Sequence, residues 1–222
     1  GGELRLVYQP QICLGANSFL RLEALLRWQH PVRGLISPAV FVPVAEESDL
    51  INGIGAWALN RACMDAMAWP KSVRVAVNVS AAQFAHAELI DTVAHALQTS
   101  GLDPDRLELE LTESVFMGDF ETIDDIFRAL KDLGVRLALD DFGTGYSSLS
   151  YLRSAPFDKI KVDRTFVEGC TQKDQNSAKI IAAIISLSDA LGMETTVEGV
   201  EAFDQLEVVR GMNARLIQGW IY

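Results

Sequence analysis

Polar and charged side chains occur at the ends of several short apolar segments in this chain of 222 residues. They are Glu23, Asn78, Glu110, Asp140, Lys161, Glu198 and Gln218, with Asp141 directly after Asp140. Carboxylates that lie close together cannot all stay ionised unless their pKa values rise or a cation compensates their charge. Because Lys161 is the only basic member of this set, bound divalent cations are the simplest compensation.

The donor atoms of this set predict which cation it would hold. Carboxylates and the Asn78 amide offer only oxygen, which favours Mg²⁺ or Mn²⁺ and argues against a thiolate zinc site. The histidines and cysteines lie elsewhere, at His30, His86, His95, Cys13, Cys63 and Cys170. Of the adjacent Asp140 and Asp141, one carboxylate can bridge two metal ions about 4 Å apart, an arrangement typical of phosphoester hydrolysis.

The residues alone therefore predict a metal-dependent hydrolase of a phosphate ester, and they do not name the ester. A divalent cation makes water a better nucleophile near neutral pH. Lys161 and Glu198 are both candidates to orient or deprotonate that water. For any one of these positions, the alternative interpretation is a solvated or ion-paired group at a strand end. Only the occurrence of all these residues at strand ends together indicates a catalytic site.

Short strands that alternate with helices are expected to position these residues. We expect strands at residues 4–8, 19–26, 73–79, 107–111, 136–140, 159–162, 195–197 and 215–218. Apolar residues have helical spacing over 123–130 and 180–187, and each stretch is followed by a glycine. Ser37 and Pro38 are typical of a helix start. This alternation favours an α/β fold, either a barrel or an open doubly wound sheet.

Side-chain alternation within the strands favours the barrel. Leu107, Leu109 and Leu111 share one face of their strand, and Glu108 and Glu110 share the other. Parallel strands covered on both faces are instead apolar throughout. A polar face directed toward a common interior suits a barrel, in which the chemistry lies at the C-terminal ends of the strands.

The composition is that of an ordinary folded protein, with 49% apolar and 22% charged residues and a net charge of −11. The acidic balance argues against a nucleic-acid polymer as partner, because such binders usually carry a basic stripe. Apolar runs fall well short of the about 20 residues that cross a bilayer, and features of a signal peptide are absent from the start. We expect one domain over residues 1–222, cytoplasmic and without membrane contact of its own.

Seven short motifs contain these residues and follow one another in a recognisable order. They are EALLRW (23–28), NVS (78–80), ELTE (110–113), DDFGTG (140–145), KVD (161–163), EGVE (198–201) and QG (218–219). In this order the sequence resembles the EAL-domain family of cyclic di-GMP phosphodiesterases over nearly its whole length. The resemblance implies a modified TIM-type (β/α)8 barrel with an antiparallel first strand. It also implies hydrolysis of cyclic di-GMP to linear 5′-pGpG in bacterial second-messenger signalling.

The resemblance further implies a role for each matched residue. One Mg²⁺ or Mn²⁺ ion would be held by Glu23, Asn78, Glu110 and Asp140, and a second by Asp140, Asp141 and Glu198. Lys161 would contact the attacking water, with Glu198 the favoured general base and Gln218 positioning water or a ligand. Arg27 would bind a substrate phosphate, a task that suits its planar guanidinium. The further substrate-binding positions would be Gln9, Leu25 and Asp163, and Glu113 would anchor the loop at 141–145.

Several expectations concern the surroundings of the site. Ca²⁺ is expected to inhibit, because its longer and looser coordination would replace near-octahedral ions. The family implies a homodimer, N-terminal sensor or GGDEF domains that can tether the protein to a membrane, and a final helix beyond Tyr222. The chain departs from the family pattern at Asp49, where glycine is usual, and at Val197, where alanine is common.

Two alternatives to an active cyclic di-GMP phosphodiesterase stay open at this point. A degenerate domain would bind the dinucleotide, or only a protein partner, without turnover. Such relatives typically lose metal ligands, whereas this sequence retains them all. A metal-dependent phosphodiesterase for another substrate would use the same metals with a different base pocket.

Overall fold

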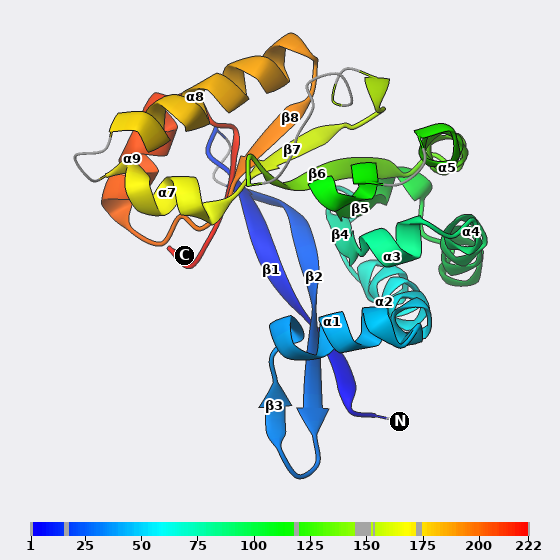
Figure 1. Cartoon of the computed structure of the whole chain (residues 1–222). Coiled ribbons are helices and arrows are strands. Elements are labelled where there is room, and N and C mark those ends of the chain that lie inside the picture. The colour runs from blue at the N-terminus through cyan, green and yellow to red at the C-terminus, as the bar shows by residue number, and fades with distance from the viewer. Residues whose placement is uncertain are drawn as a thin grey trace.

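Strands form the centre of the structure and close into a ring with helices outside it (Figure 1). The computed structural model describes residues 2–15, 18–117, 120–144, 152, 154–171 and 175–221. Around the ring the strand order is β1-β9-β8-β7-β6-β5-β4-β2, and pairing of β1 with β2 closes it. Strand β3 pairs with β2 outside the ring.

The elements alternate along the chain as the sequence predicts. The strands are β1 (Leu4–Cys13), β2 (Ser18–His30), β3 (Gly34–Ile36), β4 (Arg74–Val79), β5 (Leu107–Thr112), β6 (Arg136–Phe142), β7 (Lys159–Val162), β8 (Glu194–Val197) and β9 (Leu216–Gln218). The α-helices are α1 (Pro38–Glu47), α2 (Leu50–Ala66), α3 (Ala81–Phe84), α4 (Glu88–Ser100), α5 (Phe120–Asp132), α7 (Arg164–Cys170), α8 (Gln175–Ala190) and α9 (Phe203–Gly211). Two 3-10 turns, η1 (Pro104–Arg106) and η2 (Glu113–Met117), flank β5.

Strand β1 runs against both of its neighbours in the ring. It pairs antiparallel with β2 and with β9, whereas β2 and β4 through β9 pair parallel with one another. Gln11 lies opposite Arg21 on one side and Gln218 on the other, and the β1–β2 register shifts between Gln11 and Ile12. The predicted modified (β/α)8 barrel with an antiparallel first strand is confirmed.

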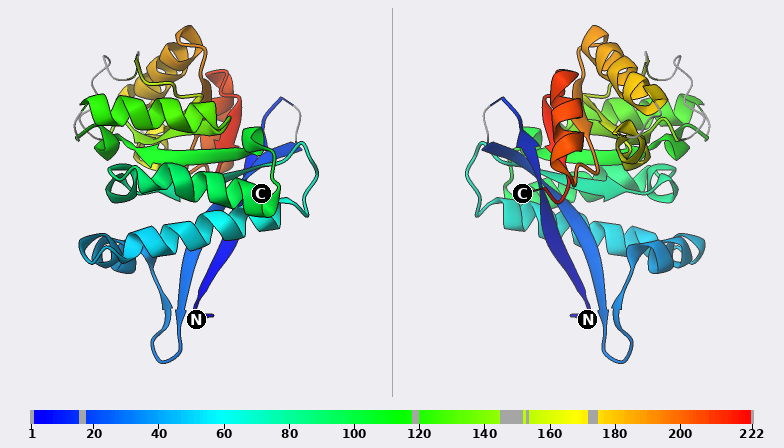
Figure 2. Two further views of the ribbon diagram at one scale, coloured as in Figure 1. Left: turned by 90° about the vertical axis from the view of Figure 1, so that its right-hand side faces the viewer. Right: turned by 90° about the vertical axis from the view of Figure 1, so that its left-hand side faces the viewer.

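Two strands are longer than the sequence indicates. Strand β1 continues to Cys13 because it pairs with β2 as a long ribbon, from Leu4 opposite Trp28 to Cys13 opposite Ser18. Strand β2 continues to His30 because its end pairs with β3. Strand β3 was not predicted; it pairs with the end of β2. Figure 2 shows this ribbon extending past helices α1 and α2, with β3 at its far end.

The inner and outer faces of the ring have opposite chemistry. The leucines at 107, 109 and 111 are fully buried and belong to the core between strands and helices. Glu108 and Lys159 are also fully buried, yet they form an ion pair with each other. Burial alone would raise the pKa of Glu108, but Lys159 and Arg21 lower it to about 2. The interior is therefore polar, as strand alternation predicts.

Helix α5 buries the apolar stripe predicted from the sequence, whereas in α8 Ile181 and Ile184 are buried but Ile180 is 40% exposed. In α5 the residues Ile123, Ile126, Phe127 and Leu130 are all buried. Gly134 follows with a positive φ of 88°, a conformation that glycine adopts without strain. Helix α1 begins with Pro38, but Val44 on this helix stays 60% exposed. Among the described residues, none of the helices is long and apolar enough to cross a membrane.

Phe127 tests the packing of the helices on the barrel. Its ring is 1% exposed and lies 4.8 Å from Phe84 and 5.2 Å from Phe157 between centroids. Phe127→Ala should lower the free energy of unfolding by about 3–5 kcal/mol, because it leaves a cavity. Phe203→Ala is the matched control, since Phe203 is 76% exposed and its loss should cost about 0.5 kcal/mol or less. Urea denaturation measures both; equal stabilities of the two variants would contradict this account.

Candidate active site

The side chain of Lys161 lies at the centre of the predicted polar cluster. Its Nζ atom is 2.7 Å from Glu198 Oε1, 2.8 Å from Glu110 Oε2, 3.0 Å from Asp140 Oδ2 and 3.3 Å from Glu23 Oε2. These carboxylates come from β2, β5, β6 and the end of β8, and Lys161 comes from β7. The parallel strands thus bring together residues that are far apart in sequence.

Amide side chains hold the Glu23 carboxylate from two sides. Asn78 Nδ2 donates to Glu23 Oε1 at 2.7 Å, and Gln218 Nε2 donates to Glu23 Oε2. Gln218 Nε2 also donates to Gln9 Oε1 at 3.3 Å, while its own Oε1 is buried and has no hydrogen-bond partner among the described residues. Asn78 is itself exposed, so its amide lies at the edge of the cluster.

Asp141 joins the cluster through an unusual backbone conformation. Its φ is 53°, a left-handed value that is uncommon outside glycine, asparagine and aspartate. Its backbone N–H donates to Asp140 Oδ1 at 2.9 Å. One carboxylate oxygen each of Asp140, Asp141 and Glu198 lie within 4.8 Å of one another. The strained residue therefore places a second aspartate beside the first.

Burial and mutual repulsion shift the proton affinities of these groups. Burial raises the pKa of Glu198 to about 7, against the opposing charge of Lys161. Burial and the neighbouring Asp140 raise the pKa of Asp141 to about 6. The pKa of Glu110 lies well above its usual value because the group is fully buried beside Glu23. The cluster thus holds more negative charge than its single ammonium group compensates.

Lys161 and Glu23 show the opposite balance. Burial alone would lower the pKa of Lys161, but Asp140, Glu110 and Glu23 raise it well above its usual value. Burial would raise the pKa of Glu23, yet Lys161 and the amide of Gln218 outweigh this and lower it. Lys161 is therefore an ammonium group and Glu23 a carboxylate.

The donor set suits hard divalent cations. Carboxylates and amides supply oxygen ligands at the strand ends, and the unpartnered Oε1 of Gln218 adds another acceptor. Asp140, Asp141 and Glu198 are close enough together for a shared cation. The described residues of the cluster include neither cysteine nor histidine, so a zinc site of the thiolate type does not fit.

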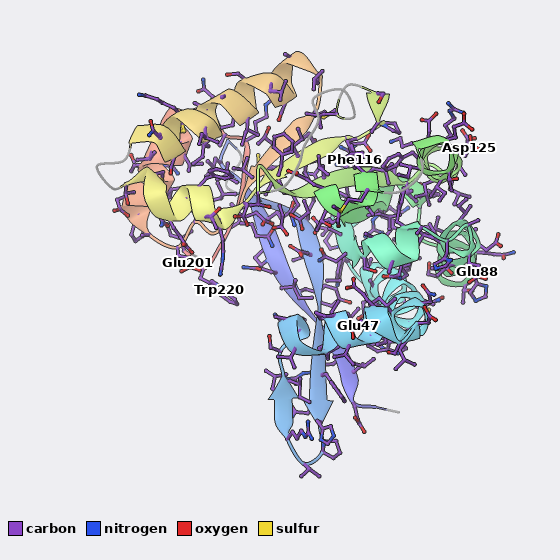
Figure 3. All side chains as sticks on the ribbon, in the orientation of Figure 1. Glu47, Glu88, Phe116, Asp125, Glu201 and Trp220 are labelled. Carbon is purple, nitrogen blue, oxygen red and sulfur yellow. The ribbon has the colours of Figure 1, made fainter. Side chains whose placement is uncertain are left out.

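A cavity of about 230 Å³ opens beside the cluster. Predicted residues that line it are Gln9, Glu23, Leu25, Asp140, Lys161, Glu198 and Gln218. Arg164, Glu201 and Trp220 also line it, although they were not predicted from the sequence. Glu201 and Trp220 lie together near α7 in Figure 3. Each of the three directly follows or ends a recognised motif, and this adjacency was the available signal.

Arg27 and Asp163, both predicted to bind substrate, do not line this cavity. Arg27 lines a neighbouring cleft with Asn78 and Leu25, and its Nη1 donates to the Leu26 carbonyl at 2.9 Å. Asp163 caps α7, because its Oδ1 accepts a hydrogen bond from Thr165 N at 3.0 Å. Leu25 lines both hollows and so connects them.

A larger apolar groove lies between β1–β3 and helices α1 and α2. Its lining includes Trp28, Phe41 and Trp57, and it gathers no cluster of acids. We therefore locate the candidate active site at the acidic cavity rather than at this groove.

Glu113 contacts the backbone of the loop that follows β6. Its Oε1 accepts a hydrogen bond from Gly143 N at 2.7 Å. Gly143 has a φ of 99°, and a Cβ atom there would lie 2.9 Å from the Phe166 ring. Of the predicted loop at 141–145, Gly145 lies outside the described residues. Glu113, the first residue of η2, thus ties the end of β5 to the segment that carries Asp141.

The sequence model of the EAL domain matches residues 1–222. The chain therefore belongs to the EAL-domain family. A solved structure titled MucR phosphodiesterase in complex with c-di-GMP is similar, with a TM-score of 0.94 and 41% identity, covering 99% of this chain and 90% of the other.

Two curated relatives are much longer than this chain. The protein y4lL of Sinorhizobium fredii is 47% identical over all of this chain, which covers 27% of the relative. The cyclic di-GMP phosphodiesterase NbdA of Pseudomonas aeruginosa is 41% identical over 99% of this chain, which covers 28% of the relative. The chain thus spans little more than a quarter of these relatives, which carry additional regions.

Glu113 gives a direct test of the loop contact. A hydrogen bond to a charged group contributes about 1.5–3 kcal/mol, so Glu113→Ala should speed amide exchange of Gly143 by about tenfold or more. Glu113→Gln keeps an acceptor oxygen and should have a smaller effect. Hydrogen exchange followed by NMR measures this, with Glu121→Ala on an exposed face of α5 as control. Unchanged exchange in Glu113→Ala would show that the contact does not hold the loop.

Proposed function

We propose that this chain hydrolyses cyclic di-GMP to linear 5′-pGpG in bacterial second-messenger signalling. The observation that carries the proposal is the convergence of Glu23, Glu110, Asp140 and Glu198 on Lys161 at one end of the barrel. The names of NbdA and of the MucR structure support the same substrate. The retained acidic residues favour turnover over a domain that only binds.

In this proposal two divalent cations, Mg²⁺ or Mn²⁺, complete the site. The first would be held by Glu23, Asn78, Glu110 and Asp140. The second would be held by Asp140, Asp141 and Glu198. When bound, such ions lower the pKa of water and stabilise negative charge on a phosphoryl group. The carboxylates, which now surround one ammonium, would then be compensated by the cations as well.

Side chains of the protein would transfer the proton and position the attacking water. Glu198 would take a proton from the attacking water as the general base. Lys161 would orient that water as a hydrogen-bond donor, because its ammonium has no proton-accepting capacity. Gln218 would position water or a ligand through its unpartnered Oε1.

Substrate binding would extend over both hollows of the site. Arg27 in the neighbouring cleft would bind a phosphate with its planar guanidinium. Gln9 and Leu25 would contact the substrate from the cavity wall. Asp163 would act from the start of α7, beside Asp141.

The larger protein would add regulation to this activity. We propose a homodimer, a cytoplasmic location for this domain, and N-terminal sensor or GGDEF domains in the full-length protein. The additional length of the relatives supports the last of these.

The activity is tested by incubating the protein with cyclic di-GMP and Mn²⁺ and detecting pGpG by chromatography. Glu23→Ala should reduce kcat/KM by about 100-fold or more, because it removes a ligand of a cation that stabilises the transition state by several kcal/mol. Lys161→Ala should lower kcat more than it raises KM. Glu47→Ala, on the exposed side of α1 (Figure 3), is the control that should keep full activity.

Each result that departs from this expectation would support a different conclusion. Binding of cyclic di-GMP by folded, metal-loaded protein without product would favour the silent receptor. Hydrolysis of other cyclic dinucleotides alone would favour a different substrate. Full activity of Glu23→Ala would refute the assigned site.

Calcium tests the preference for near-octahedral ions. Ca²⁺ takes six to eight oxygen ligands at longer distances than Mg²⁺, so Ca²⁺ added to the Mn²⁺-loaded protein should inhibit, and excess Mn²⁺ should reverse the inhibition. Initial rates across a Ca²⁺ series measure the effect. Full activity in Ca²⁺ alone would refute the assignment to Mg²⁺ or Mn²⁺.

A further inference from the structure

A second layer of buried polar side chains lies inside the barrel beneath the acidic cluster. Gln11, Arg21, Glu108 and Lys159 are each at most 1% exposed. Residues two positions apart on a strand face the same side, so the last three lie directly below Glu23, Glu110 and Lys161 of the cluster. None of these four residues is required by the proposed reaction, and yet all four are shielded from solvent.

Glu110 connects the two layers because its two oxygens have different partners. Its Oε2 accepts a hydrogen bond from Lys161 Nζ at 2.8 Å, on the side of the cavity. Its Oε1 accepts one from Gln11 Nε2 at 3.3 Å, on the side of the lower layer. Lys159 Nζ lies 4.0 Å from the same Oε1. The carboxylate is therefore held in one orientation by donors above and below.

Lys159 determines which way the Gln11 amide points. Its Nζ donates to Gln11 Oε1 at 2.8 Å. An ammonium group can only donate, so a flipped amide would place two donors against each other. Gln11 Nε2 must then face Glu110. Lys159 is itself fixed by its ion pair with Glu108.

Glu108 is in turn held from the bottom of the barrel. Arg21 Nε lies 3.5 Å and Arg136 Nε lies 3.6 Å from Glu108 Oε2. A continuous series of charges and dipoles thus runs from the two arginines through Glu108, Lys159 and Gln11 to Glu110.

We propose that Gln11 is a positioning residue that orients Glu110 for cation binding, with Lys159 setting the direction of its amide. This inference rests on the proposed function, because Glu110 is there assigned to the first cation. Without the Nε2 donor, the buried Oε1 would lose its hydrogen bond, and Glu110 would be free to turn toward Lys159. Loss of such a contact behind a metal ligand typically costs about 10- to 100-fold in metal affinity or activity.

The test measures Mn²⁺ binding without substrate, from the electron paramagnetic resonance signal of free Mn²⁺. Gln11→Met keeps the length of the side chain and removes both the donor and the strong acceptor. Gln11→His restores them, because a neutral imidazole accepts at one nitrogen and donates at the other. Gln29→Met, on the exposed end of β2, is the matched control. Thermal unfolding of the metal-free proteins is recorded alongside.

Gln11→Met should weaken Mn²⁺ binding about 10- to 100-fold, Gln11→His should recover most of it, and Gln29→Met should bind as the wild type does. Wild-type affinity in folded Gln11→Met would overturn the inference, as would an equal loss in Gln11→Met and Gln11→His, which would indicate packing alone. Should Gln11→Met fail to fold, Gln11→Asn replaces it, because its shorter amide cannot reach both partners. Its affinity should fall likewise, and a wild-type value would overturn the inference.

The same measurement separates this inference from the proposed function. Wild-type protein that binds no Mn²⁺ would refute the proposed cation site and the inference with it. Wild-type binding that the substitutions of Gln11 leave unchanged would overturn the inference alone.

Discussion

The contact of one ammonium group with several carboxylates governs the arrangement of this molecule. Lys161 is 1% exposed and contacts Glu23, Glu110, Asp140 and Glu198. Burying charge is costly, and a buried charge that loses its partners costs several kcal/mol more. The cluster can therefore exist only where the backbone delivers opposite charges to the same point. The ends of parallel strands in a closed ring meet this requirement.

The residues that stabilise the barrel are not the residues that form the buried charged cluster. Leucines, valines and isoleucines on the outer face of the strands pack against the helices and supply the hydrophobic stabilisation. The inner face carries the buried charged residues, which pair across the ring. Because side chains alternate along a strand, one segment such as β5 serves both purposes at once.

Alternation and motif order were sufficient to predict the barrel, its eight ring strands and the residues around Lys161, but not β3 or the full length of β1 and β2. Which side chains are neighbours across the ring could not be predicted, because spacing along a strand does not determine distances between strands. Arg27 therefore lines a separate cleft, and Trp220 lines the cavity although no pattern selected it. Gln11 was missed for another reason. In the reversed β1, Gln11 lies below Gln9, so the rule that later residues lie nearer the site does not apply to it.

The register shift between Gln11 and Ile12 gives β1 a fixed place against β2. In any strand, sliding by a single residue turns every side chain to the opposite face. Such a slip of β1 would expel both of its glutamines from the barrel and insert Pro10 and Ile12 in their place. The register shift thus fixes the pairing of β1 with β2, which closes the ring, at the one alignment in which both polar layers are complete.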